Sequence, residues 1–452
     1  MGVKDHSHWS GVKLSSLWGY TGIADKLLRN AGAQIGDLIE VVNGKPIKGF
    51  LMPRTEYGGE EYVVVKLRSG YNIGVKVKPD TRIEVLERGE KKPRFVKPSQ
   101  PERKATLPRV DVISTGGTIA SRVDYRTGGV EPALDAEDLY SIFPELSEKA
   151  DVKAKILFSE FSENLTPDHW RKMAYAVEET VEEETRGVVI CHGTDTMGYT
   201  AAALSFALKD LPVPVVLVGS QRSSDRPSSD AAINLISAVA TAVEAPFAEV
   251  VVAMHEETSD TRIAIHRGTK VRKCHTSARD AFKSINIPPL AYYDPLKDEI
   301  KVIGKILRRR GEGDLKVQAE FDDKVALIKY YPGMDPAIID WLLDKGIHGI
   351  ILEGTGLGHV SSRFYPSIER ATDQGVFVGM TSQCIWGSVN MNVYYTGRDL
   401  QRRGVTPLGD MLPETALVKL MWILGSTREP QEVKRLMLTN LSGEFAERRW
   451  IE

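Results

Sequence analysis

Two short threonine-rich stretches stand 77 positions apart in this 452-residue chain, Ser114–Ile119 (STGGTI) and Cys191–Thr196 (CHGTDT). Each follows or includes an apolar run that predicts a β-strand, Val110–Ile113 in the first case and Val188–Cys191 in the second. In an open α/β sheet, ligands bind where parallel strands end. The two strand ends are therefore expected to share one crevice and to supply two hydroxyl groups and a carboxylate.

These residue types suit the hydrolysis of an amide, which needs a nucleophile, a base that activates it, and donors for the oxyanion. A threonine hydroxyl is a weak nucleophile until a neighbouring base takes its proton. The segment 269–276 offers three basic candidates, Lys270, Arg272 and Lys273, and spacing alone does not choose among them. Asp195 has the charge that would hold the ammonium group of an α-amino acid.

Each signal also has a plainer explanation. A strand followed by two glycines and a helix occurs in many α/β sheets, and a lysine is usually a solvated surface residue. The two stretches in this order, each at the end of a strand and followed by a suitable lysine, favour catalysis over an ordinary pair of turns. His192 is a further candidate base, because histidine titrates nearest to neutral pH.

Composition places the chain among soluble globular proteins of about three domains. Hydrophobic residues make up 42% and charged residues 27%, and the formal net charge is −2. A nucleic-acid role would thus rest on a local patch or on a partner. No apolar run approaches the roughly 18 residues of a membrane span, and the first residues lack an apolar signal region. Three widely spaced cysteines fit a reduced compartment, so a cytoplasmic location is expected.

Pattern changes along the chain predict its organisation. Short β-rich runs at 37–42, 61–67 and 73–77, with the turn residues Asn43-Gly44 and Tyr57-Gly58-Gly59 among them, indicate a small antiparallel barrel. A charged, proline-studded stretch follows, and then strands alternate with helices, including a helix expected from Thr166 to Glu184. The predicted domains are an N-terminal barrel (1–88), a linker (89–108), an α/β catalytic domain (109–305), a second linker (306–322) and a C-terminal α/β domain (323–452). The fold class is therefore α/β, with doubly wound parallel sheets after a small all-β domain.

The two threonine stretches resemble the two signatures of the bacterial-type L-asparaginase/glutaminase family, and the similarity runs from about Arg109 to the end. The resemblance implies an asparaginase-like two-domain fold and no metal. It implies that Thr115 is the nucleophile and that Thr194 and Asp195 act with a later lysine. Register with the stretch Asp280–Ser284 (DAFKS) selects Lys273 as that lysine. It also makes His192 a structural residue of the turn.

The same resemblance places further roles on a lid and on a substrate loop. Tyr125, in a segment that contains Gly128 and Gly129, corresponds to the mobile lid tyrosine of the family. Ser162 and Glu163 correspond to the residues that bind the substrate carboxylate, although many members have glutamine or aspartate beside that serine.

The N-terminal β-rich module, together with Met380–Cys384 (MTSQC) and Val389–Tyr394 (VNMNVY), resembles one branch of this family. That branch is the D subunit of archaeal glutamyl-tRNA(Gln) amidotransferases, which are glutamine-hydrolysing ligases. The resemblance implies that the chain releases ammonia from glutamine or asparagine. It implies a partner, the E subunit, that binds Glu-tRNA(Gln), uses ATP and Mg²⁺, and receives the ammonia. This chain itself would bind no cofactor.

Family members also pair two copies near their active sites, which implies a homodimeric core within a heterodimer or heterotetramer. The basic cluster of Lys305 and Arg308–Arg310 would either meet tRNA phosphates or form a solvated linker, and we favour the linker. Two other functions remain open. One is a stand-alone cytoplasmic L-asparaginase, and the other is a catalytically silent amino-acid sensor or scaffold.

Overall fold

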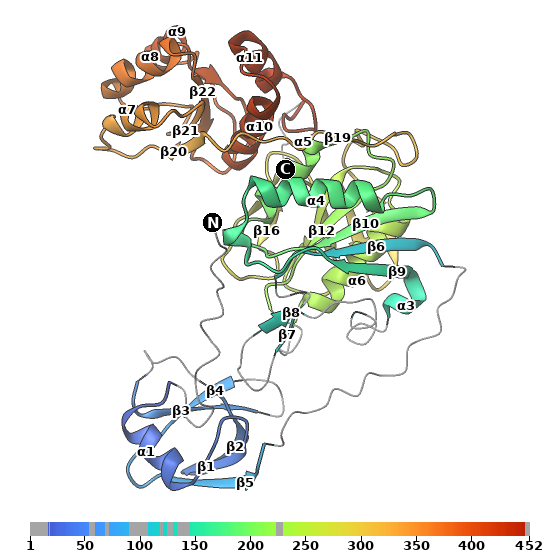
Figure 1. Ribbon diagram of the computed structural model, residues 1–452, viewed down its shortest axis with the longest axis vertical. Helices are drawn as coiled ribbons and strands as arrows, with labels where there is room; N and C mark the ends of the chain where they lie inside the picture. Colours follow the sequence, from blue (N-terminus) through green and yellow to red (C-terminus); the bar gives the residue numbers. More distant parts are fainter. Residues whose placement is uncertain are drawn as a thin grey trace, which may run out of the picture. The chain divides into compact units, whose positions relative to one another are not determined.

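The computed structural model describes most of the chain. The described residues are 17, 19–53, 59–67, 72–89, 107–117, 119, 121–123, 130–132, 139, 145–222 and 229–447. They form two compact units, one with the described residues up to 89 and the other with nearly all of those from 107 on (Figure 1). The helices within the described ranges include none that is long and apolar enough to cross a membrane.

The N-terminal unit is a five-stranded antiparallel sheet with one helix, α1 (Gly22–Asn30). Its strands are β1 (Leu38–Asn43), β2 (Lys45–Leu51), β3 (Tyr62–Lys66), β4 (Asn72–Lys76) and β5 (Arg82–Glu87), in the order β4-β3-β2-β1-β5. Gly44 forms the turn between β1 and β2 with φ of +90°, a conformation that glycine adopts without strain. Ile39 and Val41 are buried with Ala24 and Leu28 of α1, so the helix covers the apolar face of the sheet.

The larger unit contains an eight-stranded sheet that carries both threonine stretches. Five strands are parallel: β9 (Asp151–Ile156), β6 (Arg109–Ser114), β10 (Thr185–Cys191), β12 (Val215–Val218) and β13 (Val250–His255). Three antiparallel strands extend it: β14 (Ile263–Arg267), β17 (Ala291–Asp294) and β18 (Glu299–Val302). The sequence pattern indicated only the parallel part. The extension is antiparallel because these strands are joined without crossover helices.

Alternate residues of the central strands face opposite layers of helices. Val188 and Ile190 of β10 are buried with α4 (Pro167–Thr180) and α5 (Met197–Ala207). Val189 and Cys191 are buried on the other side with α6 (Ala231–Glu244). Figure 1 shows α4 and α6 on opposite faces of this sheet. A strand that is apolar on both faces is typical of a sheet covered by helices on both sides.

The expected helix from Thr166 to Glu184 ends earlier, at Thr180. The hydroxyl of Thr185 donates to the carbonyl oxygen of Thr180 at 3.0 Å and accepts from the backbone N–H of Glu182 at 3.2 Å. These bonds close a turn that leads into β10. A side-chain hydroxyl thus ends the helix where the apolar pattern alone would continue it.

The C-terminal part of the same unit is a four-stranded parallel sheet of β20 (Val325–Lys329), β21 (Gly349–Gly354), β22 (Phe377–Ser382) and β23 (Thr406–Pro407). Its helices are α7 (Ala337–Asp344), α8 (Tyr365–Asp373), α9 (Tyr395–Arg402), α10 (Pro413–Ser426) and α11 (Pro430–Leu438). Helix α10 packs against α5, and the rings of Phe206 and Trp422 stack there with centroids 5.9 Å apart. The two α/β layers therefore share one apolar core.

The segment 306–322 is attached to the first sheet domain. Its strand β19 (Lys316–Val317) pairs with β11 (Leu208–Lys209). The guanidinium of Arg310 donates to the carbonyl oxygens of Ala242 at 2.9 Å and Ala245 at 2.7 Å. Carbonyls at a helix C-terminus need such donors, so the expectation of a solvated linker is wrong for Arg310. The domain boundaries themselves stay predictions.

The remaining described elements are short. They are β7 (Ser121–Val123), β8 (Val130–Pro132), α3 (Leu146–Lys149), η1 (Ser162–Asn164), β15 (Val271–Lys273), β16 (Phe282–Ser284) and η2 (Ser362–Phe364). The strands β15 and β16 form an antiparallel hairpin, in which Lys273 is opposite Phe282. This hairpin carries the lysine that the sequence pattern selects.

Candidate active site

The first threonine stretch is anchored directly on β10. Ser114 at the end of β6 is the register partner of Cys191 at the end of β10. The backbone N–H of Thr115 donates to the carbonyl oxygen of Cys191 at 3.1 Å, and the Thr115 hydroxyl donates to the same oxygen at 2.9 Å. Thr115 is 1% exposed. Its position is therefore set by backbone contacts between two adjacent strands.

Gly116 and Gly117 allow two other segments to approach this strand end. Their φ angles are +112° and +85°, which an L-residue rarely adopts. A Cβ on Gly116 would lie 2.4 Å from the carbonyl oxygen of Glu160, and one on Gly117 would lie 2.7 Å from the backbone nitrogen of Gly193. Gly117 is thus required for the backbones of the two threonine stretches to touch, and Gly116 for the close approach of Glu160.

The second threonine stretch meets Lys273 of the β15–β16 hairpin. The Lys273 ammonium nitrogen donates to Thr194 Oγ1 at 2.8 Å and to Asp195 Oδ1 at 2.7 Å. The side chain of Lys273 is 13% exposed, whereas that of Asp195 is 68% exposed. The lysine therefore lies behind the strand end, and the carboxylate of Asp195 is open to solvent.

The other two basic candidates have different partners. Lys270 is fully buried, and its ammonium group lies 2.7 Å from Asp410 Oδ2. Arg272 forms an ion pair with Glu414 at 3.2 Å. Of these three residues, Lys273 contacts Thr194. The geometry thus separates three bases that spacing left equivalent.

His192 is held inside the turn at the start of the second stretch. It is fully buried, and its Nδ1 lies 2.6 Å from the carbonyl oxygen of Gly193. Because a carbonyl oxygen only accepts, Nδ1 carries the proton. Burial lowers the pKa of His192 from 6.5 to about 4, so the ring is neutral at neutral pH. This arrangement agrees with the structural role expected for it.

The expected substrate loop reaches the second stretch through Ser162. The carbonyl oxygen of Ser162 accepts a hydrogen bond from the Thr196 hydroxyl at 2.7 Å. A Cβ on Gly193 would lie 2.8 Å from the Cβ of Ser162, so the two residues are in contact. Glu163 follows in η1 and is exposed. Tyr125, the expected lid residue, lies outside the described residues.

The sequence pattern did not reveal the support behind Thr194. Gly219 directly follows β12, and a Cβ there would lie 2.8 Å from Thr194 Cγ2 and 2.7 Å from the carbonyl oxygen of His192. A glycine just after a buried strand was the signal available.

Within the described ranges, no group of three histidine, cysteine or acidic side chains could hold a metal ion.

Three family models match the chain, one for each folded part. They are "GatD N-terminal domain" over residues 33–86, "Asparaginase, N-terminal" over 109–307, and "Glutaminase/Asparaginase C-terminal domain" over 324–437. The D subunit of the glutamyl-tRNA(Gln) amidotransferase of Metallosphaera sedula is 54% identical over 432 residues, which cover 95% of this chain and 96% of that protein. This chain belongs to the family of glutamyl-tRNA(Gln) amidotransferase D subunits.

Other comparisons agree with membership of the D-subunit family. The D subunit of Pyrococcus abyssi is 52% identical over 426 residues, or 93% of this chain and 97% of that protein. The solved L-asparaginase of Thermococcus kodakarensis is 34% identical with a TM-score of 0.68, and L-asparaginase I of Vibrio cholerae is 29% identical with a TM-score of 0.65. Both matches cover 75% of this chain and nearly all of the asparaginase. The asparaginase-like two-domain fold is therefore confirmed.

Proposed function

We propose that this chain is the ammonia-releasing amidase component of an amidotransferase that converts Glu-tRNA(Gln) to Gln-tRNA(Gln). It would hydrolyse the side-chain amide of glutamine or asparagine. The observation that carries the proposal is the Lys273 bridge to Thr194 and Asp195, at the end of the strand on which Thr115 is anchored. The full-length similarity to D subunits supports the same function.

In the proposed reaction, Thr115 Oγ1 attacks the carbon of the side-chain amide. The tetrahedral intermediate collapses with cleavage of the C–N bond as the nitrogen receives the proton lost by the Thr115 hydroxyl, so ammonia leaves and an acyl ester remains on Thr115. A water molecule then attacks the ester, which releases glutamate or aspartate and restores the hydroxyl. Backbone N–H groups near Gly116 and Gly117 are the proposed donors for the oxyanion.

The hydroxyl of Thr115 donates to a backbone carbonyl, so this bond must break before the proton can pass to a base. Hydrogen bonds in ligand-free active sites commonly rearrange when substrate binds. We assign this proton transfer to the Thr194–Lys273 pair. Lys273 contacts Asp195 through Oδ1, which leaves Oδ2 for the ammonium group of the substrate. Ser162, Glu163 and Tyr125 stay predictions for substrate binding.

The ammonia would pass to a partner, the E subunit of the same amidotransferase. In this proposal the partner binds Glu-tRNA(Gln), activates its glutamyl carboxyl with ATP and Mg²⁺, and receives the ammonia, while the present chain binds no cofactor. We propose a homodimeric core within a heterodimer or heterotetramer, in the cytoplasm. The match of residues 33–86 to the N-terminal domain of D subunits supports this assignment over a plain asparaginase.

The decisive experiment measures ammonia release from glutamine and from asparagine, with and without the E subunit and Glu-tRNA(Gln). The proposal predicts stimulation by the complete mixture and formation of Gln-tRNA(Gln). High asparaginase turnover that neither addition changes would instead support a stand-alone L-asparaginase. Binding of aspartate without any turnover would support a silent sensor or scaffold.

A further inference from the structure

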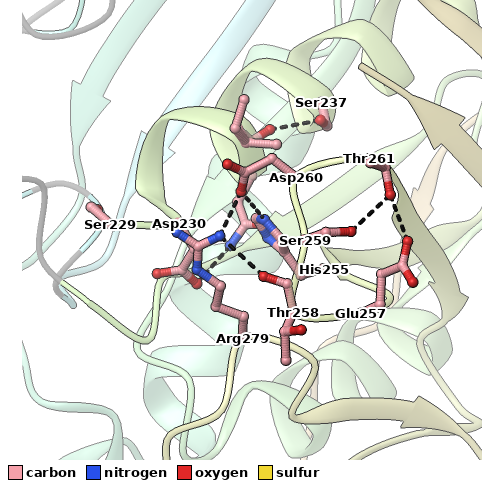
Figure 2. Close-up of polar contacts among 12 residues, drawn as sticks. Ser229, Asp230, Ser237, His255, Glu257, Thr258, Ser259, Asp260, Thr261 and Arg279 are labelled. Atoms are coloured by element: carbon pink, nitrogen blue, oxygen red, sulfur yellow. Dashed lines mark hydrogen bonds and ion pairs between the residues drawn. The ribbon is translucent and has the colours of Figure 1, made fainter. Parts of the chain in front are cut away.

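A chain of polar contacts runs through the interior from the end of β12 to the β15–β16 hairpin, apart from the residues of the proposed reaction. It links Asp230 at the start of α6, Asn234 on α6, His255 at the end of β13, Asp260 in the following loop, and Arg279 in the hairpin loop. Figure 2 shows Asp230, His255, Asp260 and Arg279 converging from these elements. Asp230, Asn234 and His255 are fully buried.

The orientation of the Asn234 amide is fixed by its partners. Its Nδ2 donates to the carbonyl oxygen of Gly219 at 2.9 Å and to Asp230 Oδ2 at 3.1 Å. Both partners are acceptors, so the amide nitrogen must face them. The amide oxygen, Oδ1, then faces His255 Nδ1 at 2.6 Å. This ring nitrogen must therefore donate.

The other ring nitrogen also faces an acceptor. His255 Nε2 lies 3.0 Å from Asp260 Oδ1, and that oxygen also accepts from Arg279 Nη1 at 2.6 Å. Burial acts to raise the pKa of Asp260, but the hydrogen bond from His255 and the charge of Arg279 outweigh it and lower this pKa. An ionised carboxylate cannot donate. Both nitrogens of His255 consequently face acceptor oxygens, and these contacts fit a ring that carries a proton on each nitrogen.

A buried cation is costly unless charges of opposite sign lie close to it. Asp260 contacts the ring directly, and the carboxylate of Asp230 lies behind the Asn234 amide. Arg279 is the facing positive charge, and it contacts the same carboxylate. Glu256, the next residue along the chain, interacts instead with the hydroxyl of Tyr292 at 3.5 Å. The charges therefore form an ordered series with the imidazolium at its centre.

The two ends of this series lie on segments next to the two halves of the proposed proton-transfer pair. At one end Asn234 holds the carbonyl of Gly219, the residue that lies against Thr194. At the other end Arg279 lies in the loop that follows Lys273. That loop is closed directly after the lysine, where the N–H of Cys274 donates to the carbonyl oxygen of Ala281 at 2.6 Å.

We propose that His255 is a positioning residue of the amidase, which as an imidazolium between Asn234 and Asp260 holds the Thr194 strand end and the Lys273 hairpin in register. It does not touch the reacting atoms. This inference rests on the roles proposed above for Thr194 and Lys273. A displacement of about 1 Å in a catalytic pair can cost on the order of 100-fold in rate. A residue that fixes the distance between Thr194 and Lys273 therefore has a large effect on the rate.

The central test is a double-mutant cycle between His255→Gln and Lys273→Met, read as the kcat and KM of glutaminase or asparaginase activity. His255→Gln alone is expected to lower kcat about 10- to 100-fold, with KM changed by less than about threefold. In the Lys273→Met background it should leave the residual rate unchanged, because it acts through that lysine. An equal further loss in that background would overturn the proposal.

A matched control lies in the same loop. The hydroxyl of Thr261 donates to Glu257 outside the Asp260–Arg279 contact, and Figure 2 shows the two sets of bonds apart. Thr261→Val should keep the kcat of the unaltered protein. If it lowers kcat as much as His255→Gln, the loop as a whole and not the imidazolium sets the geometry, and the proposal is wrong.

Arg279 provides a second variant if His255→Gln does not fold. Arg279→Gln should lower kcat in the same way and also lose its effect in the Lys273→Met background. Arg279→Lys keeps the charge and is expected to recover most of the rate. Equal loss in both Arg279 variants would contradict a role for charge.

The protonation state has its own readout in the full chain. NMR of ¹⁵N-labelled histidine should show one ring with protons on both nitrogens at neutral pH, and this signal should be absent from His255→Gln. A neutral His255 ring overturns the proposal. Normal amidase activity in Lys273→Met alone would overturn the catalytic assignment and this inference with it, whereas additivity in the cycle overturns only the inference.

Discussion

The two strand ends hold their threonine hydroxyls in different ways. At the end of β6, the backbone and hydroxyl of Thr115 both donate to one carbonyl of the adjacent strand, and the residue is 1% exposed. At the end of β10, the hydroxyl of Thr194 accepts from Lys273, which is 79 residues further along the chain. One hydroxyl is placed by strand register, and the other by a side chain from a separate hairpin.

The half of the site at Thr115 should therefore be robust to nearby substitutions, whereas the half at Thr194 should be fragile. Any sequence that preserves the pairing of β6 with β10 also preserves the position of Thr115. The Thr194–Lys273 contact depends in addition on Gly219 behind the threonine and on the loop that closes the hairpin. Changes around Lys273 should therefore alter the rate with little loss of stability.

The largest effect is expected from removing either hydroxyl. Thr115→Ala should abolish ammonia release, with a loss of about 10⁴-fold or more in kcat, because no acyl ester can form. Thr194→Ala should also abolish it, since the proton path is lost, and Asp195→Ala should do so through loss of the substrate ammonium contact. Ammonia release from glutamine and asparagine measures all three. Near-normal activity in either threonine variant would contradict a two-threonine mechanism.

The next effect compares two lysines three positions apart. Lys273→Met should lower kcat about 10²- to 10⁴-fold, the range of a general base, and should leave thermal stability nearly unchanged. Lys270→Met should leave kcat nearly unchanged and should lower the stability of the fold. It leaves the Asp410 carboxylate without its buried partner, which costs about 3–5 kcal/mol of the free energy of unfolding. Urea unfolding and steady-state kinetics on both variants test the contrast, and loss of both properties in both variants would contradict it.

The sequence pattern was informative about the strands and uninformative about these two lysines. Apolar runs predicted β6, β10, β12 and β13 because buried parallel strands are continuous in hydrophobicity. The order of motifs then placed Thr115 and Thr194 at neighbouring strand ends, which the register of β6 and β10 bears out. By contrast, Lys270 and Lys273 have the same local surroundings in the sequence. The family resemblance selected Lys273, and in the structure long-range contacts, to Asp410 and to Thr194 respectively, distinguish the two lysines.

Other features were missed for related reasons. Strand β2 contains Pro46 and buries only two of its seven residues, so it lacks the apolar alternation that marks a strand. His255 had no motif, because its partners Asn234 and Asp260 come from different elements. A polar residue in an apolar run gives no information about its partners until the fold is known. The fold was therefore more predictable than the support around the site.

A smaller effect is expected from crowding the support behind Thr194. Gly219→Ala places a methyl group 2.8 Å from Thr194 Cγ2, so the threonine must shift, which disturbs its contact with Lys273. We expect kcat to fall about 10-fold, with a smaller change in KM. Gly74→Ala, where the nearest atom would be Tyr62 Cδ1 at 3.9 Å, serves as the control and should keep full activity. Unchanged kcat in Gly219→Ala would show that the β10 end is not fragile.

The smallest effect is the contribution of His192, the neutral ring at the end of β10, to the pH dependence of stability. Burial lowers the pKa of His192 from 6.5 to about 4. The unfolded chain therefore binds a proton there below about pH 6.5, whereas the folded chain binds it only near pH 4. More protons on the unfolded state mean that stability falls as the pH falls through this window. At about 1.4 kcal/mol per pKa unit, His192 contributes roughly 3–4 kcal/mol that is present above the window and lost below it.

Melting temperature measured against pH checks this contribution. His266 is also buried, and burial lowers its pKa to about 3, so the unaltered protein should lose stability steeply on acidification. His192→Gln removes one of the two groups and should reduce the slope between about pH 6.5 and 4, whereas His266→Gln should reduce it further toward low pH. If His192→Gln has the same slope as the unaltered protein, the His192 ring of the second threonine stretch titrates freely. The β10 end would then be held only by Lys273 and by the backbone.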